Sequence, residues 1–124
     1  MLKSALLEIF LSGCAVSSLA ETGPLDLCEL EGMGAISSIR VKAIVETDTQ
    51  HGMFLVSSDC KFSIQAGKIT DTPDPSVVDF LRYVGTPMDL SWRRYEVDVT
   101  GAIVIDDSSN SKFEFSRFHS FRKI

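Results

Sequence analysis

Residues Arg93 to Phe121 decide the fold, and they read R-R-Y-E-V-D-V-T-G-A-I-V-I-D-D-S-S-N-S-K-F-E-F-S-R-F-H-S-F. The first arm alternates between an apolar and a polar side, and its apolar side carries Tyr95, Val97, Val99, Gly101, Ile103 and Ile105. A period of two with β-branched residues on one side predicts a half-buried strand. The polar run Asp107–Ser111 predicts a turn, so the whole stretch predicts a long β-hairpin.

The second arm of this hairpin is rich in phenylalanine, and the spacing is uneven. Phe113 and Phe115 are separated by an even step, as expected for one side of a strand, but the step from Phe115 to Phe118 is odd. The face is therefore expected to change there, at a β-bulge near Ser116–Arg117. We expect most of these rings to pack in the core, with Phe118 or Phe121 partly exposed as a contact residue.

Three alternating segments precede the hairpin. Ser37–Glu46 predicts a first strand, in which Ile44 alone breaks the alternation. Met53–Ser57 predicts a short second strand. Cys60–Ala66 predicts a third, with Cys60 pointing inward at its start.

Between the third segment and the hairpin, the apolar period changes from two to that of a helix. The apolar residues recur at i, i+3, i+4 and i+7, and they are Val77, Phe80, Leu81 and Val84. Asp74 suits the N-cap, Pro75 the first helical position, and Gly85 the position after the last turn. A short helix over Pro75–Val84 is therefore predicted.

The predicted order is strand, strand, strand, helix, strand, strand. This order resembles the OB-fold, a five-stranded Greek-key barrel, and in particular small exported OB-like proteins of bacteria. The resemblance covers about Ile36 to Phe121 and rests on topology and pattern, without a diagnostic motif. It implies a mainly-β barrel whose open end is covered by the helix and which bends at Gly101. A small β-sandwich and an SH3-like barrel have similar strand counts and stay open as alternatives.

The N-terminal residues have the order of a secretory signal peptide. A positive residue, Lys3, precedes an apolar run, and small residues, Ser18 and Ala20, follow it. Cleavage after Ala20 would start the mature chain at Glu21. The chain then divides into a signal peptide at 1–20, a linker and strap at 21–35, and a single barrel domain at 36–124.

Two other interpretations of the same N-terminal residues stay open. Leu11–Cys14 reads L-S-G-C, which resembles a bacterial lipobox, and Cys14 would then be lipidated and become the first mature residue. Glu8 counts against both export signals because apolar segments avoid charge. The third interpretation is an amphipathic helix that stays attached, or a misassigned start codon.

The chain has three cysteines: Cys14, Cys28 and Cys60. Both export routes remove or modify Cys14 and leave a pair, so we predict a Cys28–Cys60 disulfide formed in an oxidising compartment. The alternative is two unrelated thiols in a cytosolic protein. The expected location is therefore outside the cytoplasm: periplasmic, secreted, or attached to the membrane only by a lipid at Cys14.

No catalytic, metal or cofactor signature is present in the sequence. It has no G-x-S-x-G, H-E-x-x-H, P-loop or dinucleotide motif, and no C-x-x-C spacing for zinc. Asp106–Asn110 is rich in oxygen ligands but lacks the glycine and distal glutamate of a calcium loop, so a hairpin turn explains it better. We therefore predict no catalytic residue, no metal site and no cofactor.

Basic residues on the predicted strands give weak candidates for binding. Arg40, Lys42, Arg94 and Arg117 are expected on a shared face, with Phe118 beside them. Basic residues interleaved with aromatic ones are typical of OB-folds that bind oligonucleotides. A net charge of −5 opposes a nucleic-acid partner. The preferred hypothesis is a non-enzymatic exported module that binds a protein, peptide or glycan. An oligonucleotide-binding protein is the alternative, and an enzyme of unrecognised type comes third.

Overall fold

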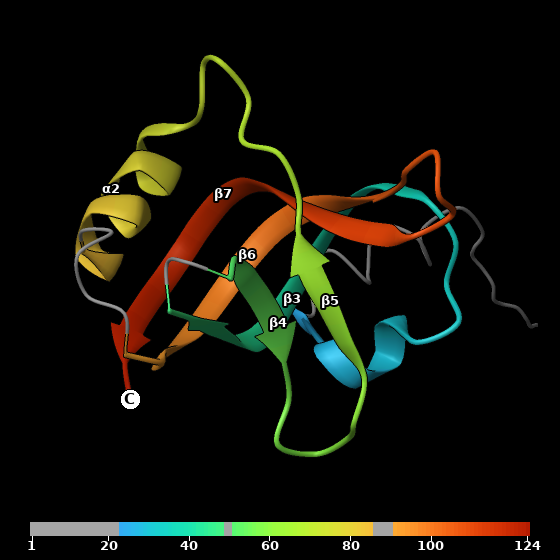
Figure 1. Ribbon diagram of the computed structural model, residues 1–124, viewed down its shortest axis with the longest axis horizontal. Coiled ribbons are helices and arrows are strands. Elements are labelled where there is room, and N and C mark those ends of the chain that lie inside the picture. Colours follow the sequence, from blue (N-terminus) through green and yellow to red (C-terminus); the bar gives the residue numbers. More distant parts are fainter. Residues whose placement is uncertain (1–22, 49–50, 86–90) are drawn as a thin grey trace, which may run out of the picture.

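The computed structural model describes residues 23–48, 51–85 and 91–124. Along the chain its elements are β2 (Leu25–Asp26), the 3-10 helix η2 (Leu27–Leu30), β3 (Ile36–Thr47), β4 (Met53–Val56), β5 (Ser63–Ala66), α2 (Pro75–Val84), β6 (Arg93–Ile105) and β7 (Ser111–Lys123) (Figure 1). The predicted hairpin, the three strands before it and the helix are all present.

The strands close into one barrel. The hydrogen-bonded order is β3-β4-β5-β7-β6, and β6 pairs again with β3 to complete the ring. All these pairings are antiparallel except β5 with β7, which is parallel. β2 pairs with β3 in parallel over two residues, at Val41 and Lys42. The fold is therefore a mainly-β, five-stranded barrel with one short helix, compatible with an OB-like fold as predicted.

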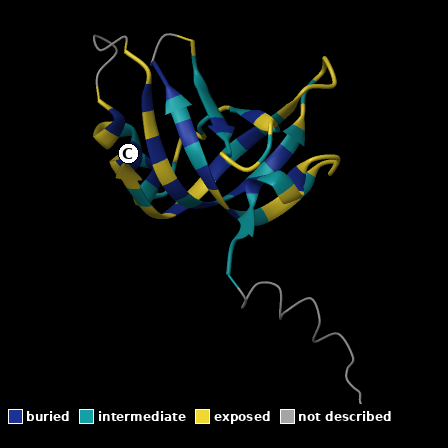
Figure 2. Ribbon diagram, turned by 90° about the horizontal axis from the view of Figure 1, so that it is seen from below, coloured by how far each residue is buried: buried dark blue, intermediate teal, exposed yellow. Residues whose placement is uncertain are grey.

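Buried and more exposed residues alternate along β6, as they do along much of the barrel (Figure 2). The residues that point inward and are almost fully buried are Tyr95, Val97, Val99 and Ile103. Gly101 lies on the same side, and an added Cβ there would be only 2.3 Å from the carbonyl oxygen of Glu114. Gly101 is thus required by the close approach of β7.

Two β-bulges in β7 explain its uneven phenylalanine spacing. The β6–β7 register shifts between Thr100 and Gly101 and again between Asp98 and Val99, and each shift leaves one extra residue on β7, Ser116 and then His119. The bulge predicted near Ser116–Arg117 is confirmed. Because Ser116 is an extra residue in β7, the inward and outward alternation shifts by one position after it, and Phe118 points into the barrel.

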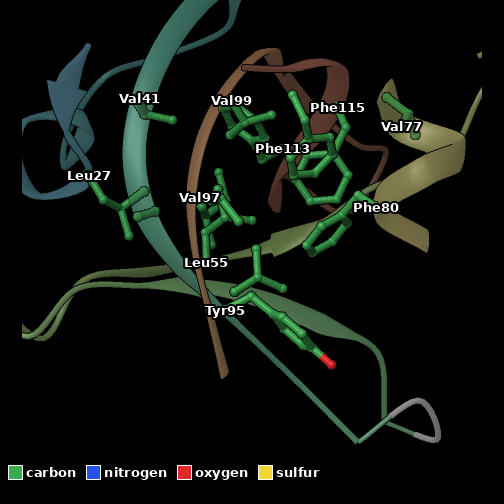
Figure 3. Packing of buried hydrophobic residues seen from close by; sticks show 14 of the residues in the cluster. Leu27, Val41, Leu55, Val77, Phe80, Tyr95, Val97, Val99, Phe113 and Phe115 are labelled. Atoms are coloured by element: carbon green, nitrogen blue, oxygen red, sulfur yellow. The ribbon is translucent and has the colours of Figure 1, made fainter. Parts of the chain in front are cut away.

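Helix α2 covers the end of the barrel beside β7 (Figure 1). Its N-cap is Asp74, which accepts a hydrogen bond from the Ser76 amide, and it ends at Gly85, whose φ of 102° suits glycine. From α2, Phe80 is fully buried and stacks on Phe118, with ring centroids 4.2 Å apart. Figure 3 shows Phe80 and other inward-pointing rings meeting inside the barrel.

Side chains of α2 also satisfy backbone groups of β7 that no strand reaches. The ladder between β5 and β7 consists of two residue pairs, so most of that edge of β7 lacks a strand partner. Ser76 Oγ accepts a hydrogen bond from the Phe118 amide at 2.8 Å, and the hydroxyl of Tyr83 accepts one from the Lys123 amide at 3.3 Å. The contact between α2 and β7 therefore packs the helix on the barrel and also supplies hydrogen-bond acceptors for backbone amides of β7.

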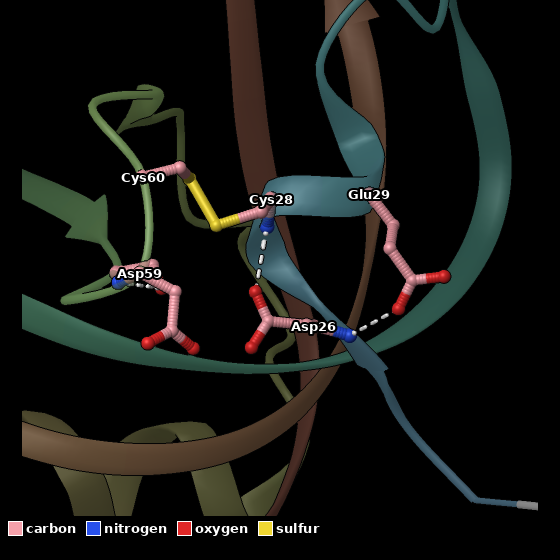
Figure 4. The surroundings of a disulfide bond; sticks show 6 residues. Asp26, Cys28, Glu29, Asp59 and Cys60 are labelled. Atoms are coloured by element: carbon pink, nitrogen blue, oxygen red, sulfur yellow. Dashed lines mark hydrogen bonds between the residues drawn. A yellow bond between two sulfur atoms is a disulfide. The ribbon is translucent and has the colours of Figure 1, made fainter.

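A disulfide joins the segment before the barrel to the β4–β5 loop (Figure 4). Cys28 lies in η2, between the buried Leu27 and Leu30, and bonds Cys60 across a Cα–Cα distance of 6.0 Å. The predicted pairing is confirmed. The predicted start of the third strand is wrong, because β5 begins at Ser63 and Cys60 lies in the loop that reaches toward η2.

The signal peptide predicted at 1–20 and the lipidation predicted at Cys14 lie outside the described residues. Within the part of the chain that is described, no helix has the length and apolar character needed to span a membrane.

Candidate functional site

The outer surface of β3, β6 and β7 carries polar side chains in cross-strand rows, and we call it the outer face. The register gives the rows as Arg40, Thr100 and Arg117; Lys42, Asp98 and Ser120; Ile44, Glu96 and Arg122; and Glu46 with Arg94. These residues are all exposed or partly exposed, whereas their neighbours along each strand are mostly buried. The predicted shared face for Arg40, Lys42, Arg94 and Arg117 is therefore present.

Three of the four arginines of this face are held by ion pairs across the strands. Arg40 binds Asp98 with two parallel hydrogen bonds of 2.9 and 2.8 Å. The side chain of Arg94 lies 3.0 Å from a carboxylate oxygen of Glu46, and that of Arg122 lies 2.9 Å from one of Glu96. A bidentate pair fixes the orientation of both groups, so the Arg40–Asp98 pair is ordered before a ligand arrives.

The charge around Asp98 is set by its basic neighbours. The hydrogen bond from Arg40 lowers the pKa of Asp98, and this effect exceeds the opposing effect of partial burial. The charges of Arg40, His119 and Lys42 lower that pKa further. Asp98 therefore stays ionised next to a group of cations, and it is the only carboxylate in the first two rows.

Lys42 and Arg117 differ from the paired arginines. Both are exposed, and within the described ranges neither has a side-chain hydrogen bond or an ion pair. Arg117 lies close enough to Asp74 for its charge to lower the pKa of that carboxyl, although the hydrogen bonds from Ser76 are the larger cause. These two cations remain accessible to a ligand.

Two shallow depressions meet at Lys42 and Glu96. The larger has a volume of about 230 Å³ and extends over β6 and β7 to Asp98, Ser120 and Arg122. The smaller, of about 150 Å³, extends over β3 toward the end of β4, and its lining includes Asp26 and Asp59. Most residues that line the two depressions are polar. Together their lining residues come from β2, β3, β4, β6 and β7.

Phe118 does not belong to this face. It was predicted as a candidate contact residue, but it is only 5% exposed and its ring is stacked on Phe80. The first bulge in β7, at Ser116, precedes Phe118 and places its ring inside the barrel. The outer face thus has no contribution from the phenylalanine that sequence reasoning placed there.

The two histidines have different surroundings. As the extra residue of a bulge, His119 lies beside Thr100, with 2.8 Å between His119 Nε2 and Thr100 Oγ1. His51, on the β3–β4 turn, is 68% exposed and its Nδ1 lies 2.5 Å from a carboxylate oxygen of Asp48. His119 therefore belongs to the outer face. The uneven phenylalanine spacing predicts a bulge in β7, but it does not predict that His119 is the extra residue of a second bulge.

The oxygen-rich loop between β6 and β7 is a hairpin turn, as predicted. Asp106 accepts hydrogen bonds from the amides of Ser108 and Asn110, each at 2.9 Å, so its carboxylate stabilises the turn itself. Within the described residues, no three or more side chains of His, Cys, Asp or Glu come together in a way that could hold a metal ion. No known protein family, curated protein or solved structure matches the chain.

Proposed function

We propose that the protein is a non-enzymatic exported module that binds a protein, peptide or glycan through the outer face. The observation that carries the proposal is the pair of depressions meeting at Lys42, on a surface where three of the four arginines are already held by cross-strand ion pairs. Groups fixed before binding lose little conformational entropy on association, which favours recognition. The closed barrel supplies the rigid support.

Export is supported by the N-terminal sequence together with the disulfide. Residues 1–20 have the order of a signal peptide, and Leu11–Cys14 matches a lipobox. The Cys28–Cys60 bond is of a kind that persists in oxidising compartments and is rare in the cytosol. We propose a periplasmic or secreted protein, or an envelope lipoprotein if Cys14 carries the lipid.

The intact mass of the native protein, isolated from fractionated cells, tests export. We expect either a chain that begins at Glu21 or a lipidated chain that begins at Cys14, and in both cases a mass that corresponds to one disulfide. An unprocessed chain with free thiols in the cytosolic fraction would contradict the proposal.

Photocrosslinking in cells tests the binding face. A photoreactive residue at Ser120, at the edge of the larger depression, is expected to yield a discrete adduct. The matched control is the same residue at Ser108, which is exposed at the tip of the β6–β7 turn. Equal labelling at the two positions, or none at Ser120, would count against the outer face.

The alternative is an oligonucleotide-binding protein, supported by the shared position of four basic residues on the outer face. Two of them, Arg40 and Arg94, already bind carboxylates, and Phe118 is buried where a base cannot stack on it. Fluorescence anisotropy with a labelled single-stranded oligonucleotide decides the matter. Absence of binding at low ionic strength would exclude it, because electrostatic affinity is greatest there.

A further inference from the structure

The smaller depression lies between two segments that are far apart in the sequence. The β2–η2 segment contributes Asp26 to its lining, and the β4–β5 loop, residues 57–62, contributes Asp59. The Cys28–Cys60 disulfide joins the same two segments. One of its cysteines lies two residues after Asp26, and the other directly follows Asp59 (Figure 4). The covalent bond therefore sets how closely these two parts of the lining approach each other.

The β4–β5 loop is held mainly at its two ends. It continues into β4 and β5, which pair over three residues, and Phe62 packs partly against the core next to β5. The hydrogen bond of its Asp59 amide goes to Ser57 Oγ, at 3.1 Å, and so stays within the loop. Among the described residues, no hydrogen bond or ion pair joins this loop to the β2–η2 segment. The disulfide alone fixes the loop against that segment.

The β2–η2 segment is held independently of the disulfide. Leu27 and Leu30 are almost fully buried in the core, and β2 pairs with β3 over two residues. The carboxylate of Asp26 accepts a hydrogen bond of 2.9 Å from the amide of Cys28, so its orientation is set within the same segment. Breaking the disulfide should therefore leave this segment in place and release the loop.

Charge does not replace the covalent bond. The two segments present like charges to the depression, Asp26 and Asp59, and like charges repel. Lys61 is the only cation of the loop, and in the described part of the chain it forms no ion pair. The groups that line the depression thus supply no attraction that would hold the loop after reduction.

We propose that the Cys28–Cys60 disulfide is a redox switch for the smaller depression. The oxidised form holds the β4–β5 loop at the depression, and the reduced form releases the loop and loses the depression. This inference rests on the proposed function, because it concerns the regulation of the same outer face. Since cytosolic thiols stay reduced, the depression forms only after export to an oxidising compartment.

The switch operates by thiol–disulfide exchange with a dithiol. One thiolate of the dithiol attacks a cysteine sulfur, breaks the S–S bond and forms a mixed disulfide. The second thiolate of the dithiol then displaces the cysteine from that mixed disulfide. Two electrons pass to the protein, both cysteines become thiols after taking up protons, and the dithiol becomes a cyclic disulfide. Oxidation after export reverses the exchange.

Nitrogen-15 relaxation of the native protein, before and after addition of dithiothreitol, tests the switch. On reduction, the order parameters of the Ser58, Asp59 and Lys61 amides should fall from about 0.85 to below about 0.6. Those of Leu27 and Leu30 should stay unchanged. The variant Cys28→Ser/Cys60→Ser should resemble the reduced protein, and dithiothreitol should have no further effect on it. Unchanged order parameters in the loop would overturn the proposal. So would general unfolding, because the disulfide would then support the whole barrel.

Photocrosslinking in cells tests the consequence for binding. A photoreactive residue at Ser58, which lines the smaller depression, should give an adduct whose yield falls at least tenfold in Cys28→Ser/Cys60→Ser. The matched position is Ser120, because the larger depression has no lining residue from the loop, and its yield should change less than twofold. Equal yields at Ser58 in both forms would overturn redox control and leave the proposed function standing. Absence of an adduct at Ser120 in either form would refute the proposed function, and the order parameters would still decide whether the loop is released.

Discussion

Replacing Gly101 by alanine tests whether the barrel depends on the close approach of β6 and β7. An added Cβ would lie 2.3 Å from the Glu114 carbonyl oxygen and 2.5 Å from the nearest ring carbon of Phe113. Both distances are well under a van der Waals contact. The phenylalanine ring is fully buried and the carbonyl belongs to the main chain, so neither can move aside by a simple side-chain rotation.

The expected loss of stability is at least about 2 kcal/mol. Overpacking a tight core costs about 1–3 kcal/mol, and a clash with main chain belongs at the upper end of that range. Replacing glycine also restricts the unfolded chain, which returns about 0.4–1 kcal/mol. For a chain of this size the net loss should lower Tm by roughly 6–12 °C. It is a large part of the roughly 5–15 kcal/mol that stabilises a typical domain.

Urea denaturation of Gly101→Ala and of the unmodified protein measures this loss. Gly34→Ala is the matched control, because its added Cβ would have no atom within 4 Å. The control should change the free energy of unfolding by less than about 1 kcal/mol. If Gly101→Ala does not accumulate as folded protein while Gly34→Ala does, the result agrees with a large loss of stability at Gly101. A loss below 1 kcal/mol at Gly101 would refute it.

Three further predictions concern the helix, the disulfide and the outer face. Ser76→Ala should cost about 1–3 kcal/mol and speed hydrogen exchange at the Phe118 amide, which loses its acceptor. Reduction of Cys28–Cys60, which are separated by 32 residues, should lower the free energy of unfolding by about 3–4 kcal/mol, as urea titration with and without a reductant would report. The pKa of Asp98 is lowered by folding, so its contribution to stability is present above about pH 4 and is lost as pH falls through the folded pKa. Asp98→Asn should therefore reduce stability at neutral pH and flatten its dependence on pH below 4; a curve parallel to that of the unmodified protein would contradict this.

The helix and the long strands could be predicted because their signals are local. For α2, the cap at Asp74, the apolar stripe and the stop at Gly85 fall within one short segment and agree with one another. For β6, alternation alone assigns each residue to the interior or the outer surface. Cys60 was misplaced because its position is set by a partner distant in the sequence, Cys28, and not by the pattern of its neighbours.

The site was only half predictable for a related reason. Alternation placed Arg40, Lys42 and Arg94 on one face, but it could not say which carboxylate each would meet. Arg40 and Asp98 are 58 residues apart in the chain and lie diagonally across the β3–β6 ladder, so their pairing depends on the register of two strands. The register in turn depends on packing throughout the barrel. Nothing local to either residue encodes it.

The bulges connect the core to the outer face. The extra residue at Ser116 allows both Phe115 and Phe118 to point inward, although an odd number of positions separates them. The extra residue at His119 has its own consequence, because it brings the imidazole beside Thr100 on the outer face. Deleting one bulge would turn the following part of β7 over and exchange its inner and outer sides. The aromatic core and the order of charges in the rows would then be lost together. A change of register in β7 should therefore abolish folding and ligand binding at once, whereas Lys42→Met should affect binding alone.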